Sequence, residues 1–403
     1  MNQIMRYPFA INQKTTTADC LRAGLMAVTL ACLACISPIA RAQSTDTAAT
    51  TATPTGVVVK TKLGGFILGF DIDRNGTDGV LAESLTLPDG KLDVAVETFD
   101  QKTGKILKTV SELKQTDDDF VALGIVGTSV GLVEEEIETG EFVTSRVYEI
   151  MDPVSGGKFT GTWTPPFTAS DIISVPFSQG SASVPVFYFD NGVSFRTKVI
   201  STNFTANTFG KSFTIPDPVF NTDDSPVMAY DSQTNQAVLG GSNGCFGCTT
   251  EIGLINITTG AFTEFEGLGF GFVNGIAVDP ETGIAVTATE DDASVEFYDL
   301  ATQTGKLVVL PGAEGCLGCS QAESGGGIAF DPMNKLFLVG QTISTTASSG
   351  SSIQVFNEQG DFVESINGLS LPAGSEYIAL QPKNRTGYVI VTPALTELQQ
   401  FTY

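Results

Sequence analysis

The sequence lacks histidine altogether, and this absence excludes several kinds of active site. A Ser-His-Asp triad, a Cys-His pair and a histidine-ligated metal centre all depend on an imidazole side chain. Any catalysis by this chain would therefore rest on carboxylates, hydroxyls, lysines or bound cations. Tryptophan is nearly absent too, with Trp163 as its one example, for which we expect packing in the core rather than ligand stacking.

Basic residues are scarce, with 21 Lys and Arg against 45 Asp and Glu, and several of them lie near the N-terminus. Arg6, Lys14 and Arg22 precede an apolar run over residues 23–39, which is followed by Ala40-Arg41-Ala42. This order is typical of a signal peptide over residues 1–42, so we predict cleavage after Ala42 and a secreted or periplasmic protein. A membrane helix is the competing interpretation, which is disfavoured because the run is short, contains a proline and has no second apolar run after it.

The chain after residue 42 is strongly acidic. Removal of residues 1–42 leaves 17 basic and 44 acidic side chains, a balance of −27. Such a charge repels phosphate polyanions and anionic lipid, so nucleic acid and membrane surfaces are poor partners. We expect a soluble monomer that meets an extracellular ligand or protein.

Four of the seven cysteines remain after cleavage, an even number in an oxidising compartment. They form two C-x-x-C motifs, made by Cys245 with Cys248 and by Cys316 with Cys319. Disulfides are the first expectation, either within each motif or crossed between the two. A thiolate metal site or a redox site is the alternative, which export disfavours because thiols oxidise outside the cell.

The exported chain divides into two parts. Residues 43–55 are rich in Thr and Ala and have no apolar period, so they predict a flexible leader. Residues 56–403 contain short β-rich runs separated by Gly, Pro, Asn and Asp, without a convincing amphipathic helix. We predict one all-β domain over residues 56–403.

An internal repeat determines the predicted architecture. Six hairpins carry an Asp or Asn followed within a few residues by Gly, and we expect each to join the third and fourth strands of one unit. These hairpins begin at Phe99, Met151, Phe189, Asn256, Tyr298 and Phe356. A second hairpin precedes most of them and gives four strands per unit; its turns lie at residues 231–235, 279–283, 331–334 and 381–384.

Four-stranded units at this spacing predict a single β-propeller of about seven blades. The last unit, residues 376–403, has room for three strands only, while residues 57–62 form a spare strand before the first unit. We expect these two ends to pair into one blade, because that pairing closes the ring and removes exposed strand edges.

One part of the repeat is similar to a known group. Residues 274–283, Asn-Gly-Ile-Ala-Val-Asp-Pro-Glu-Thr-Gly, and residues 295–302 resemble the blade signature of NHL- and YVTN-type propellers, best within residues 226–403. The resemblance implies the propeller fold, whereas activities in this group range over lyases, lactonases, receptors and scaffolds. In gluconolactonase-like propellers an Asn at a similar strand start helps bind a divalent metal, so the resemblance implies that role for Asn274.

An acidic cluster falls on the face where propellers usually carry function. Glu290, Asp291 and Asp292 lie in a predicted second-to-third turn, and the two cysteine motifs fall in loops of the same face. Adjacent acids repel one another unless a cation or water separates them. We consider this cluster, with Asn274, as a binding site, against the alternative of a solvated loop.

A second candidate is a calcium loop near the start of the domain. Asp71, Asp73, Asn75 and Asp78 carry oxygen ligands at nearly alternating positions, and Gly76 is the sixth residue of the segment. The twelfth position, where a calcium loop needs Glu, is Ala82. The alternative is that this segment forms the first turn of the first blade.

From these residues we predict a ligand- or protein-binding module that has no catalytic constellation and requires no cofactor, with calcium as the one candidate. The first alternative is a metal-dependent hydrolase or lactonase of the calcium type, with Asn274 as a ligand. The second is a structural cell-surface protein tethered by the Thr/Ala-rich leader. Carboxylates converging on a channel metal would favour the hydrolase, and an apolar channel would favour the binding module.

Overall fold

The structure is a computed structural model of the chain. It describes residues 52–403 except for residues 117–118, 127–128, 139–140, 153–156, 164–169, 177–180, 182, 191–195, 204–205, 207, 221–226, 243–248, 272, 290–293, 312–326, 345–348, 372–377 and 392–394.

The described residues form seven four-stranded antiparallel sheets, each of which we call a blade and name by its strands. The first three blades are β2 (Phe66–Ile72), β3 (Asp78–Thr86), β4 (Leu92–Asp100) and β5 (Ile106–Thr116); β6 (Asp119–Val126), β7 (Ser129–Glu138), β8 (Glu141–Asp152) and β9 (Gly157–Trp163); and β10 (Ser170–Ser174), β11 (Ser183–Asp190), β12 (Thr197–Asn203) and β13 (Thr208–Thr214).

The next blades continue this plan along the chain. They are β14 (Val227–Asp231), β15 (Gln236–Ser242), β16 (Thr249–Asn256) and β17 (Phe262–Phe270); β18 (Val273–Asp279), β19 (Ile284–Thr289), β20 (Ser294–Asp299) and β21 (Thr304–Val309); and β22 (Ile328–Asp331), β23 (Leu336–Ser344), β24 (Ser349–Asn357) and β25 (Phe362–Asn367). The last blade contains β26 (Ile378–Gln381), β27 (Thr386–Val391), β28 (Glu397–Thr402) and β1 (Pro54–Lys60). Two three-residue 3-10 helices, η1 (Pro218–Phe220) and η2 (Pro382–Asn384), complete the described elements.

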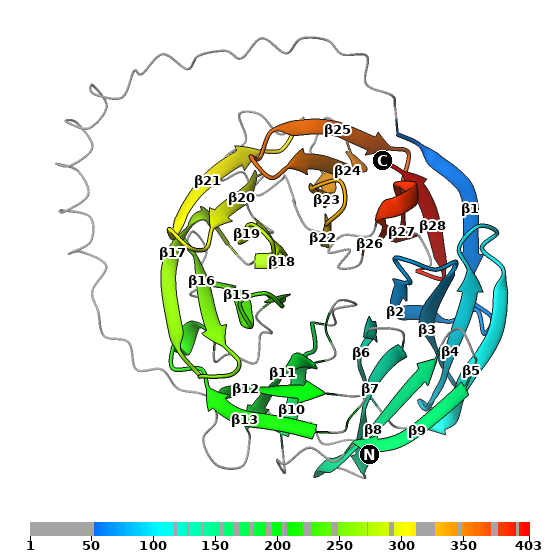
Figure 1. The fold of residues 1–403 in the computed structure, drawn as a ribbon. Helices are drawn as coiled ribbons and strands as arrows, with labels where there is room; N and C mark the ends of the chain where they lie inside the picture. Colours follow the sequence, from blue (N-terminus) through cyan, green and yellow to red (C-terminus); the bar gives the residue numbers. More distant parts are fainter. Residues whose placement is uncertain are drawn as a thin grey trace, which may run out of the picture. The chain divides into compact units, whose positions relative to one another are not determined.

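The blades form a β-propeller, in which β2, β6, β18, β22 and β26 lie nearest the centre of their blades (Figure 1). Contacts between first strands run around the ring: β14 touches β18, β18 touches β22, β22 touches β26, β26 touches β2, β2 touches β6, and β6 touches β10. The prediction of an all-β propeller with four-stranded antiparallel blades is confirmed. Within the part of the chain that the structure describes, no helix is long and apolar enough to cross a membrane.

The two ends of the domain share one blade. Strand β1 pairs antiparallel with β28 along its outer edge, with Val59 opposite Leu398 and Lys60 opposite Glu397. This confirms the predicted closure of the ring. Residues before the predicted boundary at residue 56 also pack on the domain, because Ala52 is buried among the side chains of the last blades and β1 begins at Pro54.

The first-to-second turns repeat one local geometry. The side chain of the last residue of β14, β18 and β22, an Asp in each case, accepts a hydrogen bond from the backbone NH two residues later. The turn then ends on a residue with a positive φ, which is Gly283 in the β18–β21 blade and Asn235 in the β14–β17 blade. Asp and Asn favour such turns because their short side chains bond the nearby backbone, so the local sequence is enough to place them.

One predicted hairpin lies elsewhere in its blade. The segment that begins at Phe189 joins β11 to β12, the second and third strands, rather than the third and fourth. The other five predicted hairpins do join third and fourth strands. Asp-Asn-Gly favours a hairpin between any two adjacent strands and says nothing about their order in a blade, which explains the error.

The blades pack by placing large side chains against small ones. In β18, Ile276 and Val278 face the preceding blade and cluster with Ala229. Ala277, between them, faces the following blade and clusters with Phe330. Alternate residues of a strand point to opposite faces, so the side chains of β18 pack against both neighbouring blades.

Candidate functional site

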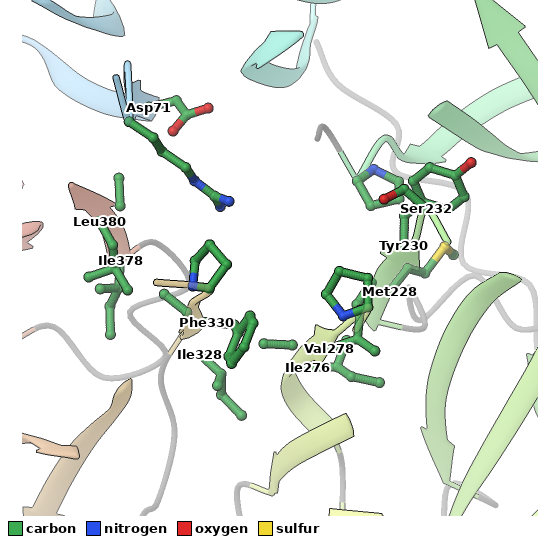
Figure 2. Close-up of a pocket in the computed structure, with 18 residues that line it drawn as sticks. Asp71, Met228, Tyr230, Ser232, Ile276, Val278, Ile328, Phe330, Ile378 and Leu380 are labelled. Atoms are coloured by element: carbon green, nitrogen blue, oxygen red, sulfur yellow. The ribbon is translucent and has the colours of Figure 1, made fainter. Parts of the chain in front are cut away.

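A pocket of about 290 Å³ lies among the inner strands (Figure 2). Most of its wall comes from four apolar triplets of equivalent position, which are residues 228–230 of β14, 276–278 of β18, 328–330 of β22 and 378–380 of β26. Each triplet has alanine in its middle. The triplets therefore give the pocket mostly apolar side chains, while polar atoms form the larger part of its exposed surface.

The rim of the pocket is formed by residues that follow these strands. Ser232, Pro280 and Pro332 stand in the first-to-second turns of their blades, and Pro176 follows β10. The pocket thus extends toward the face of the first-to-second turns. This is the opposite face from the one that the sequence analysis favoured for function.

The acids at the ends of the inner strands do not contribute carboxylates to the described lining. Asp231, Asp279 and Asp331 are fully buried, and each serves its own turn. Asp279 accepts a hydrogen bond from the Thr282 hydroxyl at 2.6 Å, in addition to the bond from the backbone NH two residues on. The three carboxylates accept hydrogen bonds within their turns and do not line the pocket.

The first blade supplies the two charged residues of the lining, Asp71 and Arg74. The Asp71 carboxylate accepts hydrogen bonds from the backbone NH of Ile72 at 2.7 Å and of Ile125, in β6, at 2.9 Å. Asp71 therefore fastens the first blade to the second. Arg74 follows in the β2–β3 turn and is exposed to solvent.

Two buried glutamines hold the turn that carries Arg74. The Gln101 side-chain amide donates to the carbonyls of Asp73 at 3.0 Å and Asp78 at 2.7 Å. From the last blade, the Gln381 amide donates to the Gly76 carbonyl at 3.0 Å. Both ends and the middle of this turn are thereby fixed to neighbouring strands.

The predicted calcium ligands all lie in or beside this same turn. The Asp73 carboxylate accepts the Asn75 NH at 2.8 Å, as in the other first-to-second turns, and Asp78 accepts the Thr77 hydroxyl at 3.0 Å. Across residues 52–403, outside the gaps given above, no three His, Cys, Asp or Glu side chains gather as metal ligands. Calcium stays a prediction, which is tested by thermal unfolding in excess calcium against excess chelator.

The other predicted site residues do not reach this pocket or lie outside the described residues. Asn274 is the second residue of β18 and is half-buried at an irregularity in the pairing with β19, whereas the lining begins at Ile276. The acidic cluster (Glu290, Asp291 and Asp292) lies outside the described residues. So do the two cysteine motifs, Cys245 with Cys248 and Cys316 with Cys319.

A group of charges adjoins the pocket between the β18–β21 and β22–β25 blades. The Lys335 ammonium lies 3.2 Å from Asp279 and 3.6 Å from Glu358, and also 5.6 Å from the ring centre of Phe330, which lines the pocket. The nearby Asp279 carboxylate and burial raise the pKa of Glu358 to about 7. A group that titrates near neutral pH therefore lies close to the pocket.

Sequence reasoning missed the pocket triplets and Arg74. A signal for both was present in the repeat, because the triplets recur with alanine in the middle and the first blade departs from them at residue 71. The departure becomes visible only after the first-to-second turns have been aligned, and the turn of the first blade is one residue longer than the turns that follow β14, β18, β22 and β26.

No protein-family model and no curated protein matches the sequence. Solved structures do match the fold. The β-propeller domain of Cps50 (Swd1) from Myceliophteria thermophila is 10% identical with a TM-score of 0.55, covering 87% of this chain and 99% of that one. The RRP9 WD40 repeats are 13% identical with a TM-score of 0.57, covering 87% and 98%.

Raptor from Chaetomium thermophilum is similar over part of its length. It is 10% identical with a TM-score of 0.57, and the match covers 86% of this chain and 29% of that one. At such identities the likeness shows the β-propeller fold alone. The function has to be argued from the site.

Proposed function

We propose that this protein is an exported binding module that receives an apolar group of its ligand or partner in the channel pocket. The observation that carries the proposal is the set of apolar side chains that four equivalent strand segments contribute to the pocket lining. Burial of apolar ligand surface in such a wall stabilises a complex by about 25 cal/mol for each Å² removed from water. Concave, mostly apolar sites with a few polar groups are the usual form of ligand pockets.

The same observation favours binding over hydrolysis. A metal-dependent hydrolase would need several carboxylates converging on the channel, whereas the described lining contains one, Asp71. Both Asp71 oxygens already accept backbone hydrogen bonds.

Two features of the sequence support a place outside the cytoplasm. The first 42 residues have the order of a signal peptide, and the four remaining cysteines form an even set. The NHL- and YVTN-like residues 274–283 form most of β18 and its following turn, and they supply one of the four wall segments. Within that group, receptors and scaffolds use the fold to bind.

The proposal is tested with a neutral apolar probe, N-phenylnaphthylamine, whose fluorescence rises in apolar surroundings. The purified protein should bind it, and Ser232→Phe, which fills the rim, should weaken binding about tenfold or more. Gln233→Phe is the matched control, because Gln233 is the next residue of the same turn, is exposed and does not line the pocket.

Circular dichroism and thermal unfolding must first show that both variants fold. If Ser232→Phe does not, Pro332→Phe fills the opposite part of the rim from an exposed turn position. The proposal is wrong if the native protein does not bind the probe, or if the rim variants and Gln233→Phe bind it equally well.

A further inference from the structure

The four strands that contribute the pocket triplets each have one free edge. In their blades β14, β18, β22 and β26 stand at the end of the strand order, so each pairs with a second strand on one side only. Backbone N–H and C=O groups on the other side have no strand to bond. We call this other side the inner edge. It faces the pocket, because the triplets of all four strands line it.

Hydrogen bonds identify the residues of β22 whose backbone groups point to the inner edge. The Gly340 N–H of β23 donates to the C=O of Gly327, just before β22, at 3.1 Å. Bonded and non-bonded pairs alternate along two antiparallel strands. With the register of β22 on β23, Ala329 is therefore bonded to β23. Ile328 and Phe330 direct their N–H and C=O groups to the inner edge.

The same alternation holds in the other three strands. In β18 the Gly283 N–H of the turn donates to the Asp279 C=O at 2.9 Å, so Asp279 faces β19. Alternation then leaves Ile276 and Val278 facing the inner edge. Strands β14 and β26 enter their turns in the same register, with four residues between the last paired positions. The first and third residues of every triplet thus present their backbone groups to the pocket.

The burial of the two strands in one hairpin agrees with an open inner edge. Ile276, Ala277 and Val278 of β18 each keep 8% of their surface exposed, whereas Ala285 and Val286 of the paired strand β19 keep 0%. Both strands pack between neighbouring blades, and only β18 has an edge without a partner strand. The exposed part of the triplets is therefore at the inner edge.

These backbone groups account for polar surface in the pocket. The triplet side chains carry one polar group, the Tyr230 hydroxyl, which donates to the Asn235 side chain at 3.0 Å. Asp71 and Arg74 also line the pocket, and both have partners within the protein. Within the part of the chain that the structure describes, no other group bonds the inward N–H and C=O groups of the triplets.

The second blade shows what an inner strand bonds when an acceptor is near. The Ile125 N–H of β6, also the first strand of its blade, donates to the Asp71 carboxylate of the first blade at 2.9 Å. Between the first two blades the protein thus supplies the acceptor itself. At the four triplets a ligand would supply both acceptors and donors.

An extended peptide segment matches this wall. Its N–H and C=O groups alternate along the chain as those of a strand do, and free strand edges pair with such segments. Residues that face the same edge are about 7 Å apart, so about three residues of peptide reach both inward residues of one strand. The inward groups carry no net charge, so a neutral segment fits them. Its side chain can contact the apolar side chains of the triplets.

We infer that the pocket takes a neutral, extended peptide segment with an apolar side chain, which pairs through its main chain with one of the four inner strands. This inference rests on the proposed function and names its ligand class. A ligand without N–H and C=O groups displaces the water that solvates the inner edge and replaces none of its hydrogen bonds. A peptide should therefore bind more tightly than an apolar probe of similar size.

The first test compares a peptide with an ester of the same shape. Isothermal titration measures the affinity of the purified protein for acetyl-Ala-Leu-Ala-amide and for the analogue in which the two amides that flank leucine are esters. An ester has no N–H and is a weaker acceptor. The peptide should bind about tenfold more tightly than the ester or better, and it should displace N-phenylnaphthylamine. Equal affinities, or no binding of the peptide, would overturn the inference.

Proline substitutions identify the strand with which the peptide pairs. Proline is tolerated in a strand where its missing N–H faces away from the partner strand. The variants place it at the first residue of each triplet, with valine at the same position as the matched control; they are Met228→Pro, Ile276→Pro, Ile328→Pro and Ile378→Pro. At least one should bind the peptide about fivefold more weakly than its valine control, with equal affinities for N-phenylnaphthylamine. If none does, the inference is wrong.

Thermal unfolding tests the orientation of β22 without a ligand. Ile328→Pro should unfold within about 2 °C of Ile328→Val, because the lost N–H makes no bond in the sheet. Ala329→Pro should unfold about 5 °C or more below the native protein, because it removes a bond to β23. Equal losses for the two proline variants would show that the backbone groups of Ile328 do not face the inner edge.

The outcomes separate this inference from the proposed function. If N-phenylnaphthylamine binds and Ser232→Phe blocks it, while peptide and ester bind equally, the proposed function holds and main-chain pairing is wrong. If sorbitol displaces the probe and the peptide does not, the inner edge takes hydroxyl groups and the inference is also wrong. If neither the probe nor the peptide binds, the proposed function fails as well.

Discussion

In the β18–β21 blade the third strand carries Glu296 three residues before Asp299, and in the β2–β5 blade Glu97 stands three residues before Asp100. Both glutamates are almost completely buried. They occupy the same place in the repeat, and yet their surroundings differ. The comparison shows what a buried charge requires from its neighbours in this fold.

Glu296 is surrounded by hydrogen-bond donors. The hydroxyls of Thr250, from the preceding blade, and of Thr287 lie 3.0–3.1 Å from its carboxylate oxygens, and the Tyr298 hydroxyl bonds it as well. Burial raises the pKa of Glu296, and these hydrogen bonds oppose the rise. Gly269 is glycine because a Cβ there would lie 1.8 Å from the carboxylate.

Glu97 has far fewer donors. One oxygen accepts the Thr109 hydroxyl at 3.1 Å, while Oε2 accepts no hydrogen bond from the described residues. The neighbouring Glu83 carboxylate is itself held by the backbone NH groups of Lys62 and Leu63. Burial and the charge of Glu83 raise the pKa of Glu97. Burial thus disfavours the charge at this repeat position in both blades, but hydrogen-bond donors offset much more of that cost for Glu296 than for Glu97.

The largest effect is expected from Glu296→Ala, which should lower the free energy of unfolding by about 4 kcal/mol. The substitution leaves a cavity and three hydroxyl donors without their acceptor. Glu296→Gln, which keeps the shape, should cost about 1–2 kcal/mol. Urea denaturation at pH 7 measures both, and a loss below about 1 kcal/mol for Glu296→Ala would mean that water replaces the carboxylate.

The next effect concerns the first turn of the β18–β21 blade, where Asp279 faces Glu358. Native Glu358 keeps its proton up to about pH 7, while the unfolded chain loses it near its ordinary pKa of 4.5. Its contribution to stability is therefore complete below about pH 4.5 and lost as the pH rises through about 7. Glu358→Gln should remove a fall of roughly 2 kcal/mol over this range.

The check is the free energy of unfolding against pH for the native protein and for Glu358→Gln. The two curves should converge at low pH and separate as the pH rises. Two parallel curves would show that Glu358 is not protonated at neutral pH in the folded state.

A smaller effect of opposite sign is expected from Glu97→Gln. Because the pKa of Glu97 is raised, its ionisation on going to higher pH destabilises the folded state. The amide removes that charge and can donate to Glu83, so the variant should be about 1 kcal/mol more stable at pH 8 and unchanged near pH 4.5. Urea denaturation at pH 8 and pH 4.5 measures the free energy of unfolding. If Glu97→Gln destabilises the protein at pH 8, as Glu296→Gln should, then the two buried glutamates do not differ as proposed.

The smallest effects should be equal in the two blades. Asp100 accepts hydrogen bonds from the Thr103 hydroxyl and NH, and Asp299 accepts the NH groups of Ala301 and Thr302. Asp100→Ala and Asp299→Ala should each cost about 1 kcal/mol or less at pH 7. The Thr103 hydroxyl and NH lower the pKa of Asp100. The stability that the Asp100 carboxylate contributes is therefore lost as the pH falls below about 4. Thermal unfolding of the two variants should agree within about 0.5 kcal/mol.

Much of the fold could be predicted because its signals are local. The turns at Asp231, Asp279 and Asp331 form through hydrogen bonds to residues two or three positions away, so a short window of sequence contains all the partners. The hairpin at Phe189 shows the limit, since its turn signal is local but its place in the blade is not.

The candidate site was less predictable. The spacing of Asp71 from other acids predicts a calcium ligand, whereas the structure shows its carboxylate bonded to the backbone of β6 and lining the pocket. The position of Arg74 in the pocket lining could not be predicted from a motif, because Arg74 is a single arginine in a turn. Comparison with the equivalent positions of the other blades shows that both residues depart from the repeat.

The sequence by itself determined the repeat, the four-stranded blades, the turns and the closure of the ring by its two ends. All of these depend on period, turn chemistry and strand pattern, which are properties of neighbouring residues. Only the tertiary structure decided where the pocket lies and which buried glutamate finds its donors. Thr250 and Glu296 are 46 residues apart, and Gln381 and Gly76 are 305 apart, so packing between blades, rather than any local pattern, brings them together.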